Sequence, residues 1–202
     1  MLKPLSSILS LSSLYSIFQA SLGAFSCRQK FVRDYVKPSL GDKVLDIGCG
    51  PGDLLAHLSD IEYIGFDYSS DYISSARLKY GHLGKFYCQD VSEISVGQTD
   101  CFDIVLAVGI IHHLDNSKAL DLCRLANSLL KPGGKLVTFD GVFGEDQSEI
   151  ARYIIAQDRG QYVRTKEGYL SITSQVFSDI KVSIRHDLLR IPYTHLILEC
   201  FK

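Results

Sequence analysis

The sequence has no excess of charge of either sign and no long apolar run. Its 202 residues include 21 Lys and Arg against 23 Asp and Glu, which gives a formal net charge of −2 at pH 7. Because there is no basic field and no polybasic tail, the usual electrostatic footprint of a nucleic-acid-binding protein is missing. The longest apolar run is too short to cross a bilayer. We therefore expect no nucleic-acid partner and no membrane span.

Paired cysteines are missing as well. The six cysteines are scattered, none forms a CxxC pair, and most lie in apolar runs, where cysteine usually acts as a small buried hydrophobe. This pattern is typical neither of a metal site nor of a disulfide framework. We expect reduced thiols, no bound metal and a cytoplasmic location.

The N-terminal segment has only a faint likeness to a signal peptide, because serines dilute its apolar residues and its basic region is a single lysine. Leu11, Leu14 and Phe18 recur at helical spacing, so an amphipathic helix explains the segment equally well.

From residue 43 onward, short apolar runs alternate with helical patterns. The runs that predict strands cover residues 43–48, 62–67, 85–90, 102–110 and 135–141. The fourth run is almost wholly apolar, as expected of a central parallel strand buried on both faces. Such alternation predicts an open parallel sheet with helices on both faces and ligands beyond the carboxyl ends of the strands.

Residues that commonly begin or cap helices stand between these strands. The first is expected to begin near residues 52–53, the second is capped by Ser70, and the third by Ser117 or Asn116 with help from Asp115.

After the fifth strand the pattern changes. Helices are expected over residues 148–157 and 166–177, the second capped by Thr165, and strands over 180–186 and 194–201. About seven residues join the last two strands, which is too few for a parallel crossover, so they should form an antiparallel pair.

The loop after the first strand contains glycines at alternate positions, Gly48, Gly50 and Gly52. A dinucleotide-binding loop reads GxGxxG, whereas this one reads GxGxG and contains Pro51, which has no N–H to offer a phosphate. No GK[ST] follows, so the segment is not a P-loop. The loop suits a ligand that brings a carboxylate and an amine rather than phosphates.

Acidic residues end three of the strands. Asp67 lies nineteen residues after Gly48, near the spacing expected of an acid that holds ribose hydroxyls. Asp90 can accept from an adenine amino group, and a cationic sulfonium would be favoured by both acids together with Asp46. The ligand indicated is an adenosine that carries an amino acid.

The segments VLDIGCGPGD, GFD, QDV, FDIVLAVGIIHHLD and LKPGGKLVTFD resemble, in order, the motifs of class I S-adenosylmethionine-dependent methyltransferases of the small-molecule type. The resemblance implies S-adenosylmethionine as cofactor and a doubly wound, seven-stranded, mostly parallel Rossmann-like sheet with an antiparallel last strand. It also implies one domain over residues 1–202. Residues 1–40 would form N-terminal helices or a lid, 41–141 the cofactor-binding half, and 142–202 the acceptor-binding cap and last strands.

The resemblance further implies which residues hold the cofactor. In chain order these are Tyr15, Gln19, Asp46, Gly48, Gly50, Gly52, Asp67, Tyr68, Asp90, Val91 and Val108. Asp46 would hold the methionine end and Asp67 the ribose, while Tyr68 would pack on the adenine. Gly50 and Gly52 would permit close approach of the ligand.

Histidines are the candidate general bases, since imidazole titrates near neutrality. His112 and His113 follow the fourth strand, and His186 follows the sixth. The alternative for the first two is structural, with one imidazole orienting the loop and the other packing beneath it.

The C-terminal third contains a dense polar set. The candidate acceptor-binding residues are Arg159, Arg164, Arg190 and Tyr193. The alternative is an internal Asp–Arg network that braces the cap helix against the sheet edge.

We expect methyl transfer to a small-molecule acceptor. The loop IHHLD lacks the (N/D)PP(Y/F) signature that similar enzymes place there for amide or base nitrogens, which favours an oxygen or a carbon acceptor. The first expectation is an oxygen, such as a sugar, lipid-linked or natural-product hydroxyl. The alternatives are a non-catalytic S-adenosylmethionine-binding regulatory protein and an NAD-dependent oxidoreductase.

Overall fold

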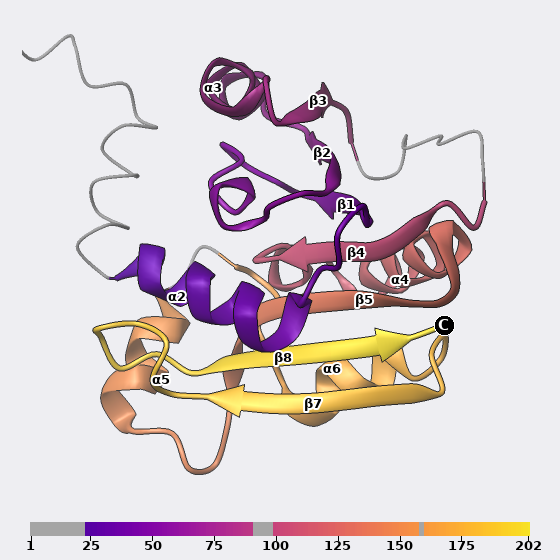
Figure 1. Ribbon diagram of the computed structural model, residues 1–202. Coiled ribbons are helices and arrows are strands. Elements are labelled where there is room, and N and C mark those ends of the chain that lie inside the picture. The colour runs from indigo at the N-terminus through magenta and orange to yellow at the C-terminus, as the bar shows by residue number, and fades with distance from the viewer. Residues whose placement is uncertain (1–22, 91–98, 158–159) are drawn as a thin grey trace, which may run out of the picture.

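The computed structural model describes residues 23–90, 99–157 and 160–202, and its centre is one twisted sheet (Figure 1). The order along the sheet is β3-β2-β1-β4-β5-β8-β7, and the short strand β6 pairs with β5. The strands are β1 (Lys43–Ile47), β2 (Glu62–Asp67), β3 (Gly84–Cys88), β4 (Phe102–Val108), β5 (Leu130–Phe143), β6 (Arg164–Thr165), β7 (Asp179–Arg185) and β8 (His195–Phe201). The doubly wound, mostly parallel sheet predicted from the sequence is confirmed, with β6 as an eighth strand of two residues.

The last strand is antiparallel to both of its neighbours. β8 lies between β5 and β7 and pairs antiparallel with each, whereas β1 to β5 pair parallel with one another. Residues 186–194 make the connection from β7 to β8, and so short a connection permits only a hairpin-like return. The predicted antiparallel pair is confirmed, and β7, not the last strand, forms the edge.

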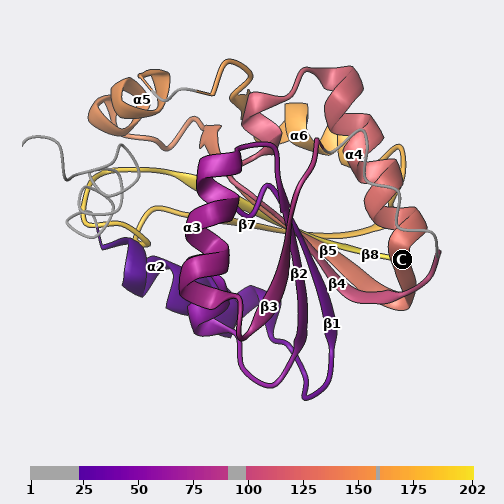
Figure 2. The same cartoon turned by 90° about the horizontal axis from the view of Figure 1, so that it is seen from above.

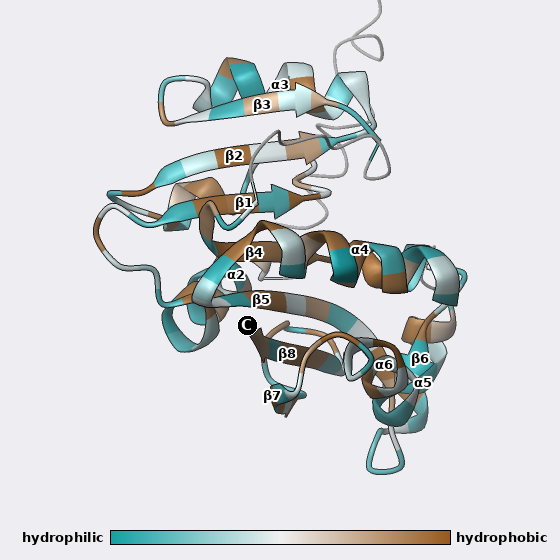
Figure 3. Ribbon diagram, turned by 90° about the vertical axis from the view of Figure 1, so that its right-hand side faces the viewer, coloured by the Kyte–Doolittle hydropathy of each residue, from teal (hydrophilic) through white to brown (hydrophobic). Residues whose placement is uncertain are grey.

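Helices cover both faces of the sheet (Figure 2). On one face lie α2 (Ala24–Phe31), which continues into a π-helical turn η2 (Val32–Val36), and α3 (Ser70–Tyr80). On the other lie α4 (Asn116–Leu129) and α6 (Lys166–Thr173), while α5 (Glu149–Ala156) follows β5 beyond its carboxyl end. Along α4, hydrophobic and hydrophilic residues alternate (Figure 3), as expected of a helix with one face on the core.

Three of the sequence predictions about helices were wrong. The segment after β1 forms turns and a single 3-10 turn, η3 (Leu55–His57), rather than an α-helix, because Leu58 returns to an extended conformation only a few residues after the glycine loop. Ser69, not Ser70, caps α3, and its hydroxyl accepts from the backbone N–H of Tyr72. Asp115, not Ser117 or Asn116, caps α4, and its carboxylate accepts from the backbone N–H of Lys118.

Two apolar clusters hold the layers together, one on each face of the sheet. Val105, Leu106 and Ala107 of β4 are fully buried, so the prediction of a central strand buried on both faces is confirmed. In the described part of the chain, none of the helices has the length and apolar character that a membrane span requires.

Candidate cofactor and acceptor site

The carboxyl ends of β1, β2, β4 and β5 meet at one edge of the sheet, where most of the predicted site residues lie. Asp46 belongs to β1 and is 2% exposed. Its Oδ2 accepts a hydrogen bond of 2.7 Å from the Tyr63 hydroxyl, while its Oδ1 has no hydrogen-bond partner among the described residues. Burial raises the pKa of Asp46 to about 7, and the neighbouring Asp67 adds to the rise. A cationic group reaching the unpaired oxygen would be stabilised there.

The glycine loop passes over the end of β2. The backbone N–H groups of Gly48 and Cys49 both donate to the carbonyl of Phe66, at 2.8 and 2.9 Å. Gly50 has a φ of +55°, and no atom lies within 4 Å of the position that a Cβ would occupy. At Gly52 a Cβ would meet the ring of Phe86 at 3.0 Å. Gly50 therefore leaves open space for a ligand, whereas internal packing accounts for Gly52.

Asp67 ends β2 and is 8% exposed. Its Oδ2 accepts the N–H of Gly50 at 2.9 Å and its Oδ1 the N–H of Ser69 at 2.8 Å, so it joins the two loops. Each carboxylate oxygen keeps a further lone pair that could accept from a ribose hydroxyl. The side chain of the next residue, Tyr68, is 80% exposed and offers an accessible ring face.

The remaining predicted cofactor residues lie at or beyond the ends of β3 and β4, or outside the described residues. Asp90 is exposed beyond the end of β3, and Val108 is half-buried at the end of β4. Next to it, Gly109 has a φ of +69° and donates its N–H to Phe139 at 2.7 Å. Tyr15, Gln19 and Val91 lie outside the described residues, as does Arg159 of the predicted acceptor site.

A buried His–Asp pair stands at the carboxyl ends of β4 and β5. His112 Nδ1 is 2.7 Å from Asp140 Oδ1, and the backbone N–H of His112 donates to the same oxygen at 3.1 Å. His112 is 6% and Asp140 2% exposed. The ring of His113 lies 4.2 Å from that of His112 between centroids, but this residue is exposed. His113 therefore packs on the outside of the pair.

Asp140 was not among the residues predicted from the sequence, although it ends the motif LKPGGKLVTFD. A signal for it exists, because an acid at the carboxyl end of the fifth strand must lie beside the loop that follows the fourth. Val108 and Phe139 are paired in register, which places Asp140 directly opposite the start of that loop.

The guanidinium of Arg164, which was predicted to bind the acceptor, is engaged by other residues of the chain. Its guanidinium donates to the backbone carbonyls of Ile111, Leu114 and Tyr162 and to the side-chain oxygen of Asn116. The N–H donors of this guanidinium are therefore bound to acceptors within the protein.

The described contacts of the predicted residues between β7 and β8 involve groups other than His112 and Asp140. His186 is exposed, with its Nδ1 3.1 Å from Thr194 Oγ1, and the stem of Arg190 packs over Gly23 before α2. The Tyr193 ring lies on that of His195, at 4.6 Å between centroids, and His195 lies in turn on Phe139 at 4.4 Å. This stack belongs to the α2 face of the sheet.

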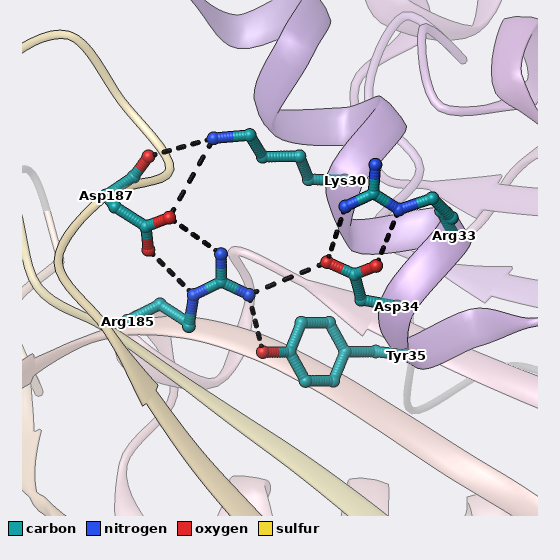
Figure 4. A network of polar contacts seen from close by, with 6 residues as sticks. All are labelled: Lys30, Arg33, Asp34, Tyr35, Arg185 and Asp187. Atoms are coloured by element: carbon teal, nitrogen blue, oxygen red, sulfur yellow. Dashed lines mark hydrogen bonds and ion pairs between the residues drawn. The ribbon is translucent and has the colours of Figure 1, made fainter.

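A polar network ties α2 and η2 to the end of β7 (Figure 4). Arg185 binds Asp187 through two hydrogen bonds of 2.7 and 2.8 Å and donates to the Tyr35 hydroxyl at 2.9 Å. Asp34 and Lys30 add ion pairs to Arg185 and Asp187, respectively. The contacts of Asp187 therefore fit the alternative of an internal Asp–Arg network. The helix that this network braces is α2, whereas the cap helix was expected.

Known proteins resemble both the sequence and the fold. Residues 44–134 match the family described as a methyltransferase domain. Ubiquinone biosynthesis O-methyltransferase of Nitrobacter winogradskyi is 36% identical over 102 residues, 48% of this chain and 37% of that protein. O-methyltransferase cnsE of Penicillium expansum is 29% identical over 169 residues, 74% of this chain and 59% of that protein.

Among solved structures, phosphoethanolamine N-methyltransferase 2 of Haemonchus contortus in complex with S-adenosyl-L-methionine has a TM-score of 0.75. It is 17% identical and covers 95% of this chain and 57% of its own, a likeness that shows a shared fold. The chain spans about half the length of the curated relatives it matches. The matched domain, the curated relatives and the shared fold together support a class I S-adenosylmethionine-dependent methyltransferase.

Proposed function

We propose that this chain transfers the methyl group of S-adenosylmethionine to a hydroxyl of a small-molecule acceptor, and that His112 takes the hydroxyl proton. The observation that carries the proposal is the buried His112–Asp140 pair at the carboxyl ends of β4 and β5, next to Val108 and Gly109. A base at this edge is needed for oxygen acceptors of high pKa.

The residues at the edge of the sheet fit the cofactor. The unpaired, buried oxygen of Asp46 suits the ammonium of an amino acid, and the open space above Gly50 suits a ligand that approaches the backbone. Asp67 retains lone pairs for ribose hydroxyls. When bound, S-adenosylmethionine supplies a methyl group on a sulfonium, and the protein supplies orientation and electrostatics.

The hydrogen bond to Asp140 prepares His112 to accept a proton. With Asp140 accepting from Nδ1–H, the lone pair of the neutral imidazole lies on Nε2, which is the nitrogen that can act as a base. The carboxylate also stabilises the imidazolium that forms and fixes the ring, so that little reorganisation accompanies proton transfer.

Two observations support an oxygen as the methyl acceptor. The curated relatives named above are O-methyltransferases, and the loop after β4 reads IHHLD, without the signature expected for amide or base nitrogens. A small acceptor is supported by the net charge of −2, which offers no field to attract a nucleic acid.

Titration calorimetry and a methyl-transfer assay test the proposal together. We expect S-adenosylmethionine to bind and NAD not to bind, and S-adenosylhomocysteine to accumulate with one or more members of a panel of hydroxylated sugars, phenols and lipid-linked alcohols. A His112→Asn variant should bind the cofactor normally and lose about 100-fold or more in kcat.

Each alternative function gives a different result. Cofactor binding with no transfer to any acceptor would favour the regulatory protein, and binding of NAD alone would favour the oxidoreductase. A His112→Asn variant as active as the unchanged protein would show that His112 is not the base. That result would not contradict methyl transfer itself.

A further inference from the structure

Arg164 connects the strand that carries Asp140 with the loop that carries His112. Its backbone belongs to β6, which pairs in parallel with β5 through Val142 and Arg164, two residues beyond Asp140. Its side chain extends to the loop after β4 and to the start of α4. One residue therefore contacts both segments that hold the His–Asp pair.

The guanidinium binds both ends of the loop that carries His112 and His113. Nη1 donates to the carbonyl of Ile111 at 3.1 Å and Nη2 to that of Leu114 at 2.7 Å, on either side of the two histidines. Nε and Nη2 both reach Asn116 Oδ1, at 3.0 and 2.9 Å. The loop is a single 3-10 turn, η5 (Ile111–His113), and these bonds fix both of its ends.

The segment before Arg164 holds the same loop from a second side. The backbone N–H of Tyr162 donates to the carbonyl of His112 at 2.9 Å, and Arg164 Nη1 donates back to the carbonyl of Tyr162 at 2.9 Å. A side chain at Gly160 would collide with the His112 ring. His112 is thus enclosed by residues 160–164 as well as bound to Asp140.

Packing holds the guanidinium in place. Its central carbon lies 5.9 Å from the ring centroid of Tyr162 and 5.7 Å from that of Tyr169. Tyr169 is itself buried and donates its hydroxyl to the carbonyl of Gly141, next to Asp140. Gly168 makes room for the arginine, since a Cβ there would lie 3.0 Å from that of Arg164.

We propose that Arg164 is a positioning residue that sets the geometry of the His112–Asp140 pair for methyl transfer; this inference rests on the proposed function. Arginine is required because its planar fork satisfies several carbonyls at fixed angles, whereas a lysine ammonium is a single point donor on a flexible stem. Arg164 does not contact the reacting atoms. It acts through the loop, and its effect should therefore fall on kcat.

The test compares Arg164→Lys with the matched control Arg124→Lys. Arg124 lies on the exposed face of α4, where its one described ion pair, with Asp121, is also exposed. In Arg164→Lys we expect kcat to fall about 100-fold, because a small misplacement of a catalytic group has effects of that size. The KM and the dissociation constant for S-adenosylmethionine should be unchanged, and Arg124→Lys should match the unchanged protein.

A spectroscopic signal separates positioning from a general loss of stability. The Nδ1 proton between His112 and Asp140 should give a low-field proton resonance in cofactor-free protein. We expect this signal in the unchanged protein and in Arg124→Lys, and expect it to broaden or disappear in Arg164→Lys. If Arg164→Lys does not fold, Asn116→Ala removes one acceptor and keeps the arginine. It should show a smaller loss of kcat in the same direction.

Three outcomes would overturn the inference: an unchanged kcat in the variants, a loss confined to KM, or a low-field resonance that survives intact. Failure of the proposed function gives a different pattern. The unchanged protein would then bind no S-adenosylmethionine or transfer no methyl group, while the resonance would still report whether Arg164 holds the pair.

Discussion

The carboxylate of Asp67 accepts the backbone N–H of Gly50 at 2.9 Å and so joins the loop after β1 to the loop after β2. The two residues are seventeen positions apart, and the parallel pairing of β1 with β2 brings them together. This bond stabilises a glycine loop whose φ angles are positive at both Gly48 and Gly50. The loop is therefore held in shape by the same acid that we expect to bind the cofactor.

Replacing Asp67 by Asn should weaken cofactor binding at least tenfold. The amide keeps the size of the side chain and an oxygen for the N–H of Gly50, but it loses a charged acceptor, and hydrogen bonds to charged groups are worth about 1.5–3 kcal/mol. Calorimetry with S-adenosylhomocysteine measures the change. Asp121→Asn, on the exposed face of α4, is the control and should bind normally. Equal affinities for the two variants would exclude a role of Asp67 in binding.

Gly50→Ala should abolish cofactor binding at a modest cost in stability. Gly41 offers a matched control, because both glycines have a positive φ and a Cβ added at either would have no atom within 4 Å. Each alanine should therefore lower the free energy of unfolding by about 1–2 kcal/mol through backbone strain. Only the alanine at Gly50 intrudes on the ligand. Denaturant melts and calorimetry on both variants check this, and a bound cofactor in Gly50→Ala would show that the open space is not the ligand site.

The buried Asp46 should make stability and cofactor binding respond to pH in opposite directions. Its pKa is about 7 in the folded protein against 3.8 for the unperturbed group, mainly because of burial. The folded state therefore binds more protons between these values, and the contribution of Asp46 to stability declines as pH rises from about 4 to about 7. Above pH 7 it levels off. The decline should amount to a few kcal/mol, since one pKa unit corresponds to about 1.4 kcal/mol.

Comparison with Asp46→Asn isolates this effect, because other titrating groups contribute equally to both proteins. The difference in unfolding free energy between the two should change across pH 4 to 7 and be flat above. Affinity for the cationic cofactor should rise over the upper part of that range in the unchanged protein only, as the carboxylate ionises. A constant difference in unfolding free energy across the range would contradict the raised pKa.

Arg185→Gln should destabilise the protein by about 1–2 kcal/mol, because it leaves the hydroxyl of the buried Tyr35 without its charged donor and breaks the contacts to Asp187 and Asp34. Asp187→Asn should cost less than about 1 kcal/mol, since this side chain is 60% exposed and solvent screens its ion pairs. Urea denaturation measures both changes. The control Arg33→Gln removes an exposed pair with the adjacent Asp34 and should be neutral. An Arg185→Gln variant as stable as this control would show that the network does not brace α2.

The sequence alone was enough to predict the sheet. Apart from Asp103, strand β4 is apolar because it is buried on both faces, and the short connection between β7 and β8 left an antiparallel pair as the only solution. The spacing of Gly48 and Asp67 was informative because Gly48 follows β1, Asp67 ends β2, and these two strands are neighbours in the sheet. The helix predicted after the glycine loop failed because composition could not show how soon the chain turns back into β2.

The pairing of side chains was decided only by the tertiary structure. His112 and Asp140 are 28 residues apart, and the register of β4 against β5 makes them partners. Arg164 was expected to bind the acceptor, and most of the groups that it contacts are backbone carbonyls, which leave no trace in the identity of a residue. Local patterns of hydrophobicity report which face of an element is buried. Which polar groups meet depends on register and on long-range packing, and these exist only once the chain has folded.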